Sequence, residues 1–256
     1  MKVVFTAGIL GLLMMLSACS GGKPVVKGSN EPNLKQAARI NVELGSGYLR
    51  QGRFKLAKTK LEKAIEQDPK NALAYSTMAL LNERIGKLDE VERYYTRALQ
   101  LDPDNADVQN NYGTFLCNQR RFKEAHKQFQ AAWENPFYQT PHFAFANAGA
   151  CALKQQDYPN AEEYFRRALQ RDPKFASVLF MMAELGISTE RYLLSRAYIQ
   201  RFHEVNRPTA ASLWLQIQAE KALGAVSNYQ ELSRKLLKDF PDSNEAAKLI
   251  ELKTHD

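Results

Sequence analysis

The chain has 256 residues, of which 45% are apolar and 25% are charged, and this composition is ordinary for a folded protein. Its formal net charge of +7 would suit a partner rich in phosphates, but acidic and basic residues alternate along the chain, as in Glu62-Lys63, and form no concentrated basic stripe. This alternation is typical of solvated helix faces and argues against nucleic acid as a partner.

Residues 1–18 are predicted to be an export signal. Met1-Lys2 supplies a minimal positive start, and the apolar stretch that follows, to Leu16, is shorter than the roughly 20 residues that a bilayer span needs. Leu16-Ser17-Ala18-Cys19 then matches the bacterial lipobox, in which the cysteine is acylated and the chain is cut just before it. We therefore expect a lipid on Cys19, with a plain secretory signal and an incidental cysteine as the alternative.

Residues 19–33 are predicted to form a flexible tether. They are rich in glycine, proline and polar residues, and they cannot bury enough apolar surface to order themselves. At about 3.3 Å per residue, such a segment would hold the first helix some tens of ångströms from the lipid. Ser20, in place of the aspartate that retains lipoproteins at the inner membrane, favours the outer membrane of a Gram-negative bacterium.

An internal period of 34 residues decides the predicted fold. Pro69 and Pro103 are 34 residues apart in similar Asp-Pro contexts, Pro173 follows after two periods plus two residues, and Pro241 after two further periods. This is the period of the tetratricopeptide repeat, in which each unit is a pair of antiparallel helices. With each proline set at place 32 of its unit, the repeats cover residues 38–71, 72–105, 106–139, 142–175, 176–209 and 210–243.

The residues inside the units fit this register. Glycine or alanine at places 8, 20 and 27 lets the helix backbones approach closely, while leucine or an aromatic residue at places 7, 17 and 24 fills the space between them. Proline ends the second helix because it cannot donate the next helical hydrogen bond. In the first unit these residues are Leu44, Gly45, Phe54, Ala57, Leu61, Ala64 and Pro69.

The pattern weakens in the last two units. Phe202 and Tyr229 stand where the fifth and sixth units should carry small residues, but both units keep the apolar spacing of helices. Residues 244–256 are predicted to form a capping helix, because terminal repeats need a polar outer face. We therefore predict an all-α solenoid of tetratricopeptide repeats over residues 34–256, with about six helix pairs and a C-terminal capping helix.

The first helices of the units are predicted to line a concave groove that binds a partner. By helical spacing, places 2, 5, 9 and 12, with their neighbours 6 and 13, face this groove. A partner's apolar face could dock there, unless Val25-Val26 of this chain covers it. Nearby arginines, Arg39 among them, would guide an acidic partner or are simply solvated. The predicted groove residues of the first two units are Val42, Ser46, Leu49, Arg50, Leu73, Ser76, Leu80 and Arg84.

The third and fourth units add amides and two cysteines. Asn111 and Asn147 occupy place 6, where an amide can donate to and accept from a bound peptide backbone, and Asn110 is predicted to line the same groove. Cys117 and Cys151 fall at places 12 and 10 of neighbouring first helices. Because these helices stack side by side in an exported protein, we predict a disulfide, with two buried free thiols as the alternative.

No catalytic, cofactor or metal site is predicted. The four histidines are scattered, and the segment that begins at His203-Glu204 resembles a zinc-protease helix but has Arg207 where the second histidine ligand would stand. The sequence also lacks a phosphate-binding glycine-rich loop and a Gly-x-Ser-x-Gly motif. We therefore expect a monomeric protein-binding module with no enzymatic activity and no small-molecule substrate.

The sequence combines a lipobox at Cys19, six repeats, the Asn110–Cys117 segment and a matching segment around Cys151. In this combination it resembles the type IV pilus biogenesis and stability lipoproteins, the pilotins of the PilF/PilW type. The resemblance implies an outer-membrane lipoprotein that faces the periplasm, binds the pilus secretin, and promotes the localisation and multimer assembly of that subunit. It also implies acylation of Cys19 and a bridge between Cys117 and Cys151. The alternative within the same architecture is a lipoprotein scaffold for another envelope machine, such as barrel insertion or peptidoglycan synthesis.

Overall fold

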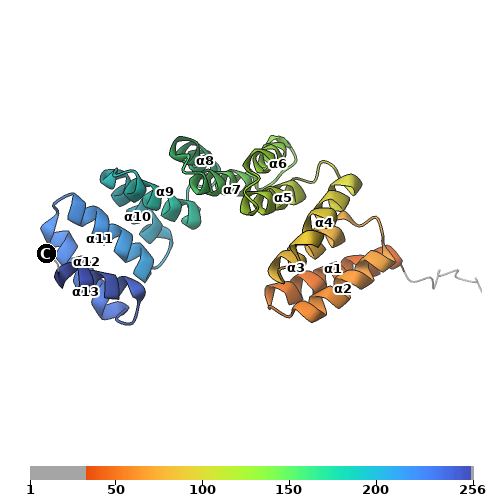
Figure 1. Cartoon of the computed structure of the whole chain (residues 1–256), viewed down its shortest axis with the longest axis horizontal. Coiled ribbons are helices and arrows are strands. Elements are labelled where there is room, and N and C mark those ends of the chain that lie inside the picture. Colours follow the sequence, from red (N-terminus) through yellow and green to blue (C-terminus); the bar gives the residue numbers. More distant parts are fainter. Residues whose placement is uncertain (1–32, 255–256) are drawn as a thin grey trace, which may run out of the picture. The chain divides into compact units, whose positions relative to one another are not determined.

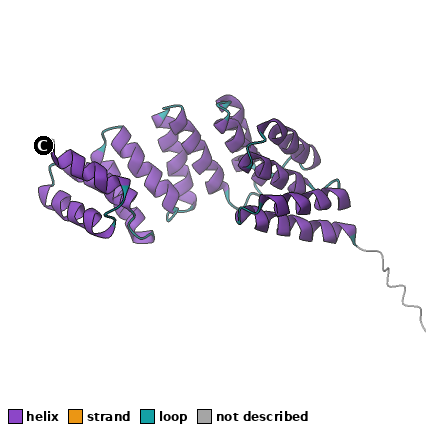
Figure 2. Cartoon of the chain, turned by 60° about the horizontal axis from the view of Figure 1, so that its bottom comes forward, coloured by secondary structure: helices purple, strands orange, loops and turns teal. Residues whose placement is uncertain are grey.

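The computed structural model describes residues 33–254, so the predicted signal peptide, Cys19 and residues 20–32 lie outside the described residues. Within the described range the chain forms thirteen α-helices and no strand (Figures 1 and 2). None of these helices is both long and apolar enough to cross a membrane. The helices are α1 (Leu34–Arg50), α2 (Phe54–Gln67), α3 (Ala72–Arg84), α4 (Leu88–Leu101), α5 (Ala106–Asn118), α6 (Phe122–Glu134), α7 (Pro141–Lys154), α8 (Tyr158–Arg171), α9 (Ala176–Ser188), α10 (Tyr192–Val205), α11 (Ala210–Ala222), α12 (Val226–Asp239) and α13 (Asn244–Thr254).

The helices pack as consecutive pairs, from α1 with α2 to α11 with α12, and each pair also contacts the next pair along the chain (Figure 1). The first helices of neighbouring pairs lie side by side, as α3 does with α5 and α5 with α7. This arrangement confirms the predicted all-α tetratricopeptide-repeat solenoid, with six helix pairs followed by the single helix α13.

The turns between pairs are set by local sequence. Asn71 follows the Asp68-Pro69 turn, and its side chain accepts a 3.1 Å hydrogen bond from the Ala74 amide, which caps α3. Asn105 caps α5 in the same way by accepting from the Val108 amide at 3.1 Å. A side-chain cap of this kind contributes about 1 kcal/mol to helix stability, so these turns both end one helix and start the next.

Small residues at place 8 let the two helices of a pair touch. A Cβ atom added to Gly113 would lie 2.8 Å from the ring of Phe129, and one added to Gly149 would lie 2.5 Å from the ring of Phe165. Both rings come from place 24 of the same unit and are fully buried. The close approach therefore follows from pairing a glycine on the first helix with a large apolar side chain on the second.

The apolar core continues from pair to pair. One buried cluster joins the second, third and fourth units around Tyr95, Tyr112 and Phe129, and the next joins the fourth and fifth units and reaches Leu215 of the sixth. At the C-terminal end, α13 inserts Ala246 and Leu249 into the cluster formed by α11 and α12. The last helix pair thus has its apolar face covered, as a terminal repeat requires.

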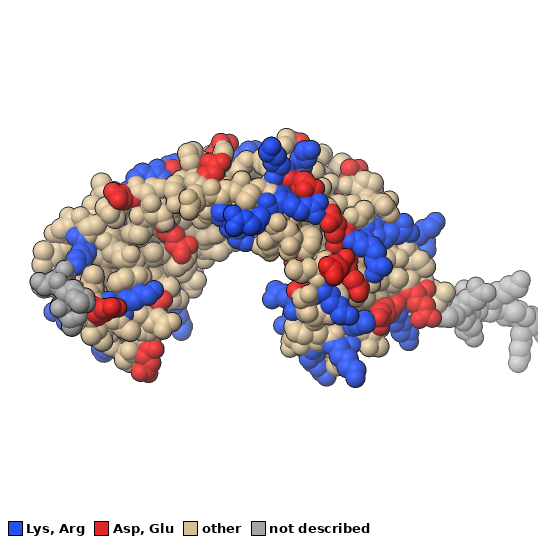
Figure 3. Space-filling model, in the orientation of Figure 1, with Lys and Arg blue, Asp and Glu red and all other residues tan. Residues whose placement is uncertain are grey.

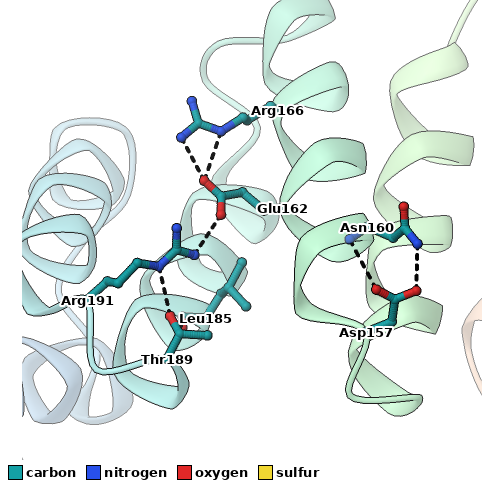
Figure 4. Close-up of polar contacts among 7 residues, drawn as sticks. All are labelled: Asp157, Asn160, Glu162, Arg166, Leu185, Thr189 and Arg191. Atoms are coloured by element: carbon teal, nitrogen blue, oxygen red, sulfur yellow. Dashed lines mark hydrogen bonds and ion pairs between the residues drawn. The ribbon is translucent and has the colours of Figure 1, made fainter.

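The same kind of glutamate–arginine ion pair occurs at two junctions between units, and the sequence analysis missed it. Arg191, which precedes α10, contacts Glu162 of α8 at 2.6 Å, and Figure 4 shows the same carboxylate accepting from Arg166. Arg121, which precedes α6, contacts Glu92 of α4 at 2.7 Å. In both cases place 21 of one unit supplies the glutamate and place 16 of the next unit supplies the arginine. We call each of these glutamate–arginine pairs a clasp. Each clasp connects the second helices of two successive pairs.

The junction between the third and fourth units has a different chemistry. There place 21 is His126 and place 16 is Asp157, and the Asp157 side chain instead accepts from the backbone and side-chain nitrogens of Asn160 at 3.3 and 2.6 Å (Figure 4). The clasp is therefore absent from this junction, which is the one that holds the two-residue insertion and both described cysteines.

The clasp makes stability depend on pH. Hydrogen bonding from Arg191 holds the pKa of Glu162 below its ordinary value of 4.5. A carboxylate with a lowered pKa in the folded state stabilises at neutral pH, and that contribution is lost as the pH falls below about 4.5 and through the folded-state pKa. We expect Glu162→Gln to lower the free energy of unfolding by about 0.5–1 kcal/mol at pH 7.

As the pH falls through the folded-state pKa of Glu162, the urea midpoints of the two proteins should converge, because a protonated glutamate and a glutamine make similar contacts. The matched control is Glu163→Gln at the exposed neighbouring position, whose ion pair with Arg167 spans 3.9 Å, and it should leave the midpoint unchanged at every pH. A difference between wild type and Glu162→Gln that stays constant from pH 7 to pH 3 would contradict this interpretation.

Candidate partner-binding surface

The predicted groove residues do not form one uniformly exposed surface. Leu73 at place 2 of the second unit is 56% exposed, and Arg50 and Arg84 are also exposed. Ser46 is half-buried. Leu49 and Leu80 are half-buried too, because each packs against an internal apolar cluster. Within the first two units, Leu73 is therefore the apolar side chain most available to a partner.

The structure corrects the prediction for three groove residues. Val42, Ser76 and Asn110, all at place 5, are buried. Val42 packs against Ala64 and Ala74, and the Ser76 hydroxyl donates to the Leu73 carbonyl at 3.1 Å. Place 5 faces the neighbouring first helix more than the groove, so these side chains support the surface and do not contact a partner directly.

The asparagines of the third and fourth units are arranged differently from the prediction. Asn147 Nδ2 donates to Asn110 Oδ1 at 3.0 Å, so the two amides join α7 to α5. Asn111 is half-buried and makes no side-chain hydrogen bond within the described residues. Of the three asparagines, Asn111 is therefore the one whose side-chain N–H and C=O groups could both bond to the backbone of a bound peptide.

Phe143 was missed by the sequence analysis. It lies at place 2 of the fourth unit, the place that Leu73 takes in the second, and it is 43% exposed. Its ring packs edge-on against Phe175 at a centroid distance of 5.3 Å, which fixes its direction. The signal was present in the register, because place 2 was predicted to face the groove. An exposed leucine and an exposed phenylalanine thus recur at one place of the repeat.

Cys117 of α5 and Cys151 of α7 form a disulfide, with their Cα atoms 5.9 Å apart. Both cysteines are buried, and the bridge lies in the core cluster that spans the second to fourth units. It joins two first helices across the junction that lacks the glutamate–arginine clasp. The bridge therefore fixes the relative position of the helices that carry Asn111 and Asn147.

Charged side chains of both signs are interspersed on the face that Figure 3 displays. Glu83, beside Arg84 on α3, accepts a 2.7 Å hydrogen bond from the hydroxyl of buried Tyr95, and burial raises the pKa of Glu83. This carboxylate satisfies a buried hydroxyl within the fold. No three metal-ligating side chains come together within the described residues in a way that could hold a metal ion. The geometry offers contact area and hydrogen bonds for a protein partner.

Comparison with known proteins assigns the family. Models of the tetratricopeptide repeat match residues 42–106, 94–127 and 142–175. The chain is 31% identical over 210 residues to the type IV pilus assembly protein PilF of Pseudomonas aeruginosa, which covers 82% of this chain and 83% of that protein. This chain belongs to the PilF/PilW family of type IV pilus tetratricopeptide-repeat proteins.

Solved structures agree with this membership. The crystal structure of PilW, a widely conserved type IV pilus biogenesis factor, matches with a TM-score of 0.78 at 30% identity and covers 84% of this chain and 99% of that one. The structure of Pseudomonas aeruginosa PilF matches with a TM-score of 0.76 at 30% identity, over 87% of this chain and 99% of PilF. The PilF/PilW fold thus extends over nearly the whole described solenoid.

Proposed function

We propose that this PilF/PilW-family protein is a lipid-anchored adaptor of the outer membrane that binds the type IV pilus secretin and promotes its localisation and multimer assembly. Membership of a family whose relatives are named for pilus assembly and biogenesis supports the pilus role. The single structural observation that carries the binding role is the repeated exposure of an apolar side chain at place 2, Leu73 and Phe143, on first helices of the solenoid.

Such a surface suits an amphipathic segment of a partner. Burial of apolar area stabilises a complex by about 25 cal/mol per Å², and aromatic side chains are common energetic centres of interfaces. Arg50 and Arg84 are exposed on the same set of helices and would attract acidic residues of the partner during encounter. In this proposal the groove supplies recognition and the acyl group on Cys19 supplies attachment to the membrane.

A cellular experiment tests both parts of the proposal. In a strain that lacks its own copy of this protein, we expect wild type to restore secretin multimers in outer-membrane fractions, and Leu73→Glu with Phe143→Glu to reduce them at least ten-fold. Leu193→Glu is the matched control, because Leu193 is an exposed apolar residue of α10, a second helix. Cys19→Ser should leave secretin multimers outside the outer-membrane fraction.

We choose Leu73 and Phe143 for replacement by glutamate because Leu49 and Leu80 pack against the core. Replacing those two leucines would disturb folding as well as binding. Normal secretin multimers with the Leu73/Phe143 variant would reject the proposed surface. General envelope damage with normal pili in the strain that lacks the protein would instead favour a scaffold for another envelope machine.

A further inference from the structure

The loop between α6 and α7 carries the two extra residues that interrupt the 34-residue period. In it, Phe137 is 83% exposed, the highest value among the large apolar side chains of the described residues. A single exposed apolar residue is common on protein surfaces. Phe137 differs because the loop around it is held by specific hydrogen bonds and borders a cleft.

Asn135 fixes the conformation of this loop. Its Nδ2 donates to the Asp104 carbonyl at 2.6 Å, which ties the loop to the preceding turn between α4 and α5. Its Oδ1 accepts from the Phe137 amide at 2.8 Å, and its carbonyl accepts from the Tyr138 amide at 3.1 Å. The exposed ring therefore stands on a defined turn, and its position costs a partner little ordering entropy.

A cleft of about 380 Å³ lies beside the ring, between this turn, the C-terminal end of α6 and Gln109 of α5. Gln109 is only 8% exposed, and its Nε2 donates to the Pro103 carbonyl at 2.8 Å. Because that carbonyl can only accept, the amide nitrogen must face it and the Oε1 atom faces the other way. The Gln109 Oε1 atom is buried and has no hydrogen-bond partner within the described residues. The lining of the cleft thus includes a glutamine whose buried acceptor lacks a donor.

The charge around the cleft is negative. Asp104 and Glu134 line it, and neither forms an ion pair within the described part of the chain. Glu134 is also the last residue of α6, where the helix macrodipole adds partial negative charge. A second, smaller cleft that Phe137 also borders is lined by Asp107. A protein with a net charge of +7 therefore presents a local acidic site with an aromatic wall.

We propose that this cleft binds a lysine or arginine side chain of a protein partner. The cation lies against the face of the Phe137 ring, an N–H donates to Gln109 Oε1, and the carboxylates of Asp104 and Glu134 neutralise the charge. Arginine fits best, because its planar guanidinium can stack on the ring and donate in several directions at once. The site uses none of the groove residues and does not depend on secretin binding.

The test uses the mature chain with Cys19→Ser, which cannot be lipidated, and a blocked tetra-arginine peptide as the probe. We expect the peptide to shift the side-chain amide NMR signals of Gln109, and a blocked tetraglutamate peptide to leave them unchanged. Phe137→Ala and Glu134→Gln should each weaken tetra-arginine binding at least five-fold. Leu193→Ala, which removes an exposed apolar side chain on α10, is the matched control and should bind normally.

The variants should fold, because Phe137 and Glu134 are both exposed, and an unchanged melting temperature verifies this. Three results would overturn the proposal: no binding of tetra-arginine, binding that leaves the Gln109 signals in place, or equal affinity of wild type and Phe137→Ala. Equal shifts from tetra-arginine and tetralysine would retain the cation site and remove only the preference for arginine.

Discussion

Replacing both Cys117 and Cys151 by alanine is expected to lower the free energy of unfolding of the third and fourth units by about 3–4 kcal/mol. The bridge closes a loop with a sequence separation of 34 residues, and in the chain-entropy model a loop of this length corresponds to about 4 kcal/mol at 25 °C. Both cysteines are buried, so loss of the sulfur atoms adds to the effect. No clasp between the second helices of this junction compensates for the loss.

Tryptophan fluorescence can follow this junction locally, which matters because repeat proteins need not unfold in a single step. Trp133 of α6 stacks on Phe145 of α7 at 4.9 Å, whereas the second tryptophan, Trp214, lies in the C-terminal cluster. With Trp214→Phe as the background, the denaturation midpoint seen by Trp133 should fall in the double-alanine variant. A reducing agent should lower the midpoint of the parent protein similarly and leave the variant unchanged; no effect of reduction on the parent would contradict the argument.

Arg196→Ala is expected to destabilise the C-terminal units by about 3 kcal/mol. Glu220 of α11 is only 1% exposed, and Arg196 of α10 donates to its two carboxylate oxygens at 2.7 and 2.5 Å. Asn228 supplies one further hydrogen bond at 3.1 Å. Removal of the arginine leaves a buried carboxylate without its counter-charge, and breaking a buried pair in this way typically costs about 3–5 kcal/mol.

The measurement is the denaturation midpoint reported by Trp214, with Trp133→Phe as the background. Arg196→Met combined with Glu220→Leu should recover most of the stability, because an apolar pair of similar volume leaves no buried charge. Lys235→Ala is the exposed control: its partner Asp239 is solvated, so the denaturation midpoint should stay close to that of the parent. A single Arg196→Ala variant as stable as the double replacement would contradict the buried-charge argument.

The fold could be predicted from sequence because the features that determine it are local and repeated. The prolines at place 32 end helices, and the glycines at place 8 meet large side chains at place 24, as Gly113 meets Phe129. The clasps could not be predicted in the same way. Arg121 and Glu92 are 29 residues apart, and among the described junctions only two carry such a pair, so the repeat period does not predict it.

The partner-binding surface was predicted less completely than the fold. Helical spacing gives the direction of each place, but it does not give the distance to the neighbouring first helix, and this distance buries Val42, Ser76 and Asn110. The exposure of Phe143 follows from the register, since place 2 recurs in every unit. Phe137 takes place 32 of the third unit, where other units carry proline, in the loop lengthened by the insertion, and only three-dimensional contacts of Asn135 show that this loop has a fixed shape.

The most direct test of secretin recognition is co-purification from detergent-solubilised outer membranes with the tagged mature protein. We predict that the wild-type protein and Leu193→Glu bring down the type IV pilus secretin in equal amounts, and that the folded Leu73→Glu, Phe143→Glu variant loses at least nine-tenths of it. If the wild-type protein instead captures a different envelope machine and no secretin, the proposed adaptor role is contradicted. The chain would then be a PilF/PilW-family protein that acts on another partner.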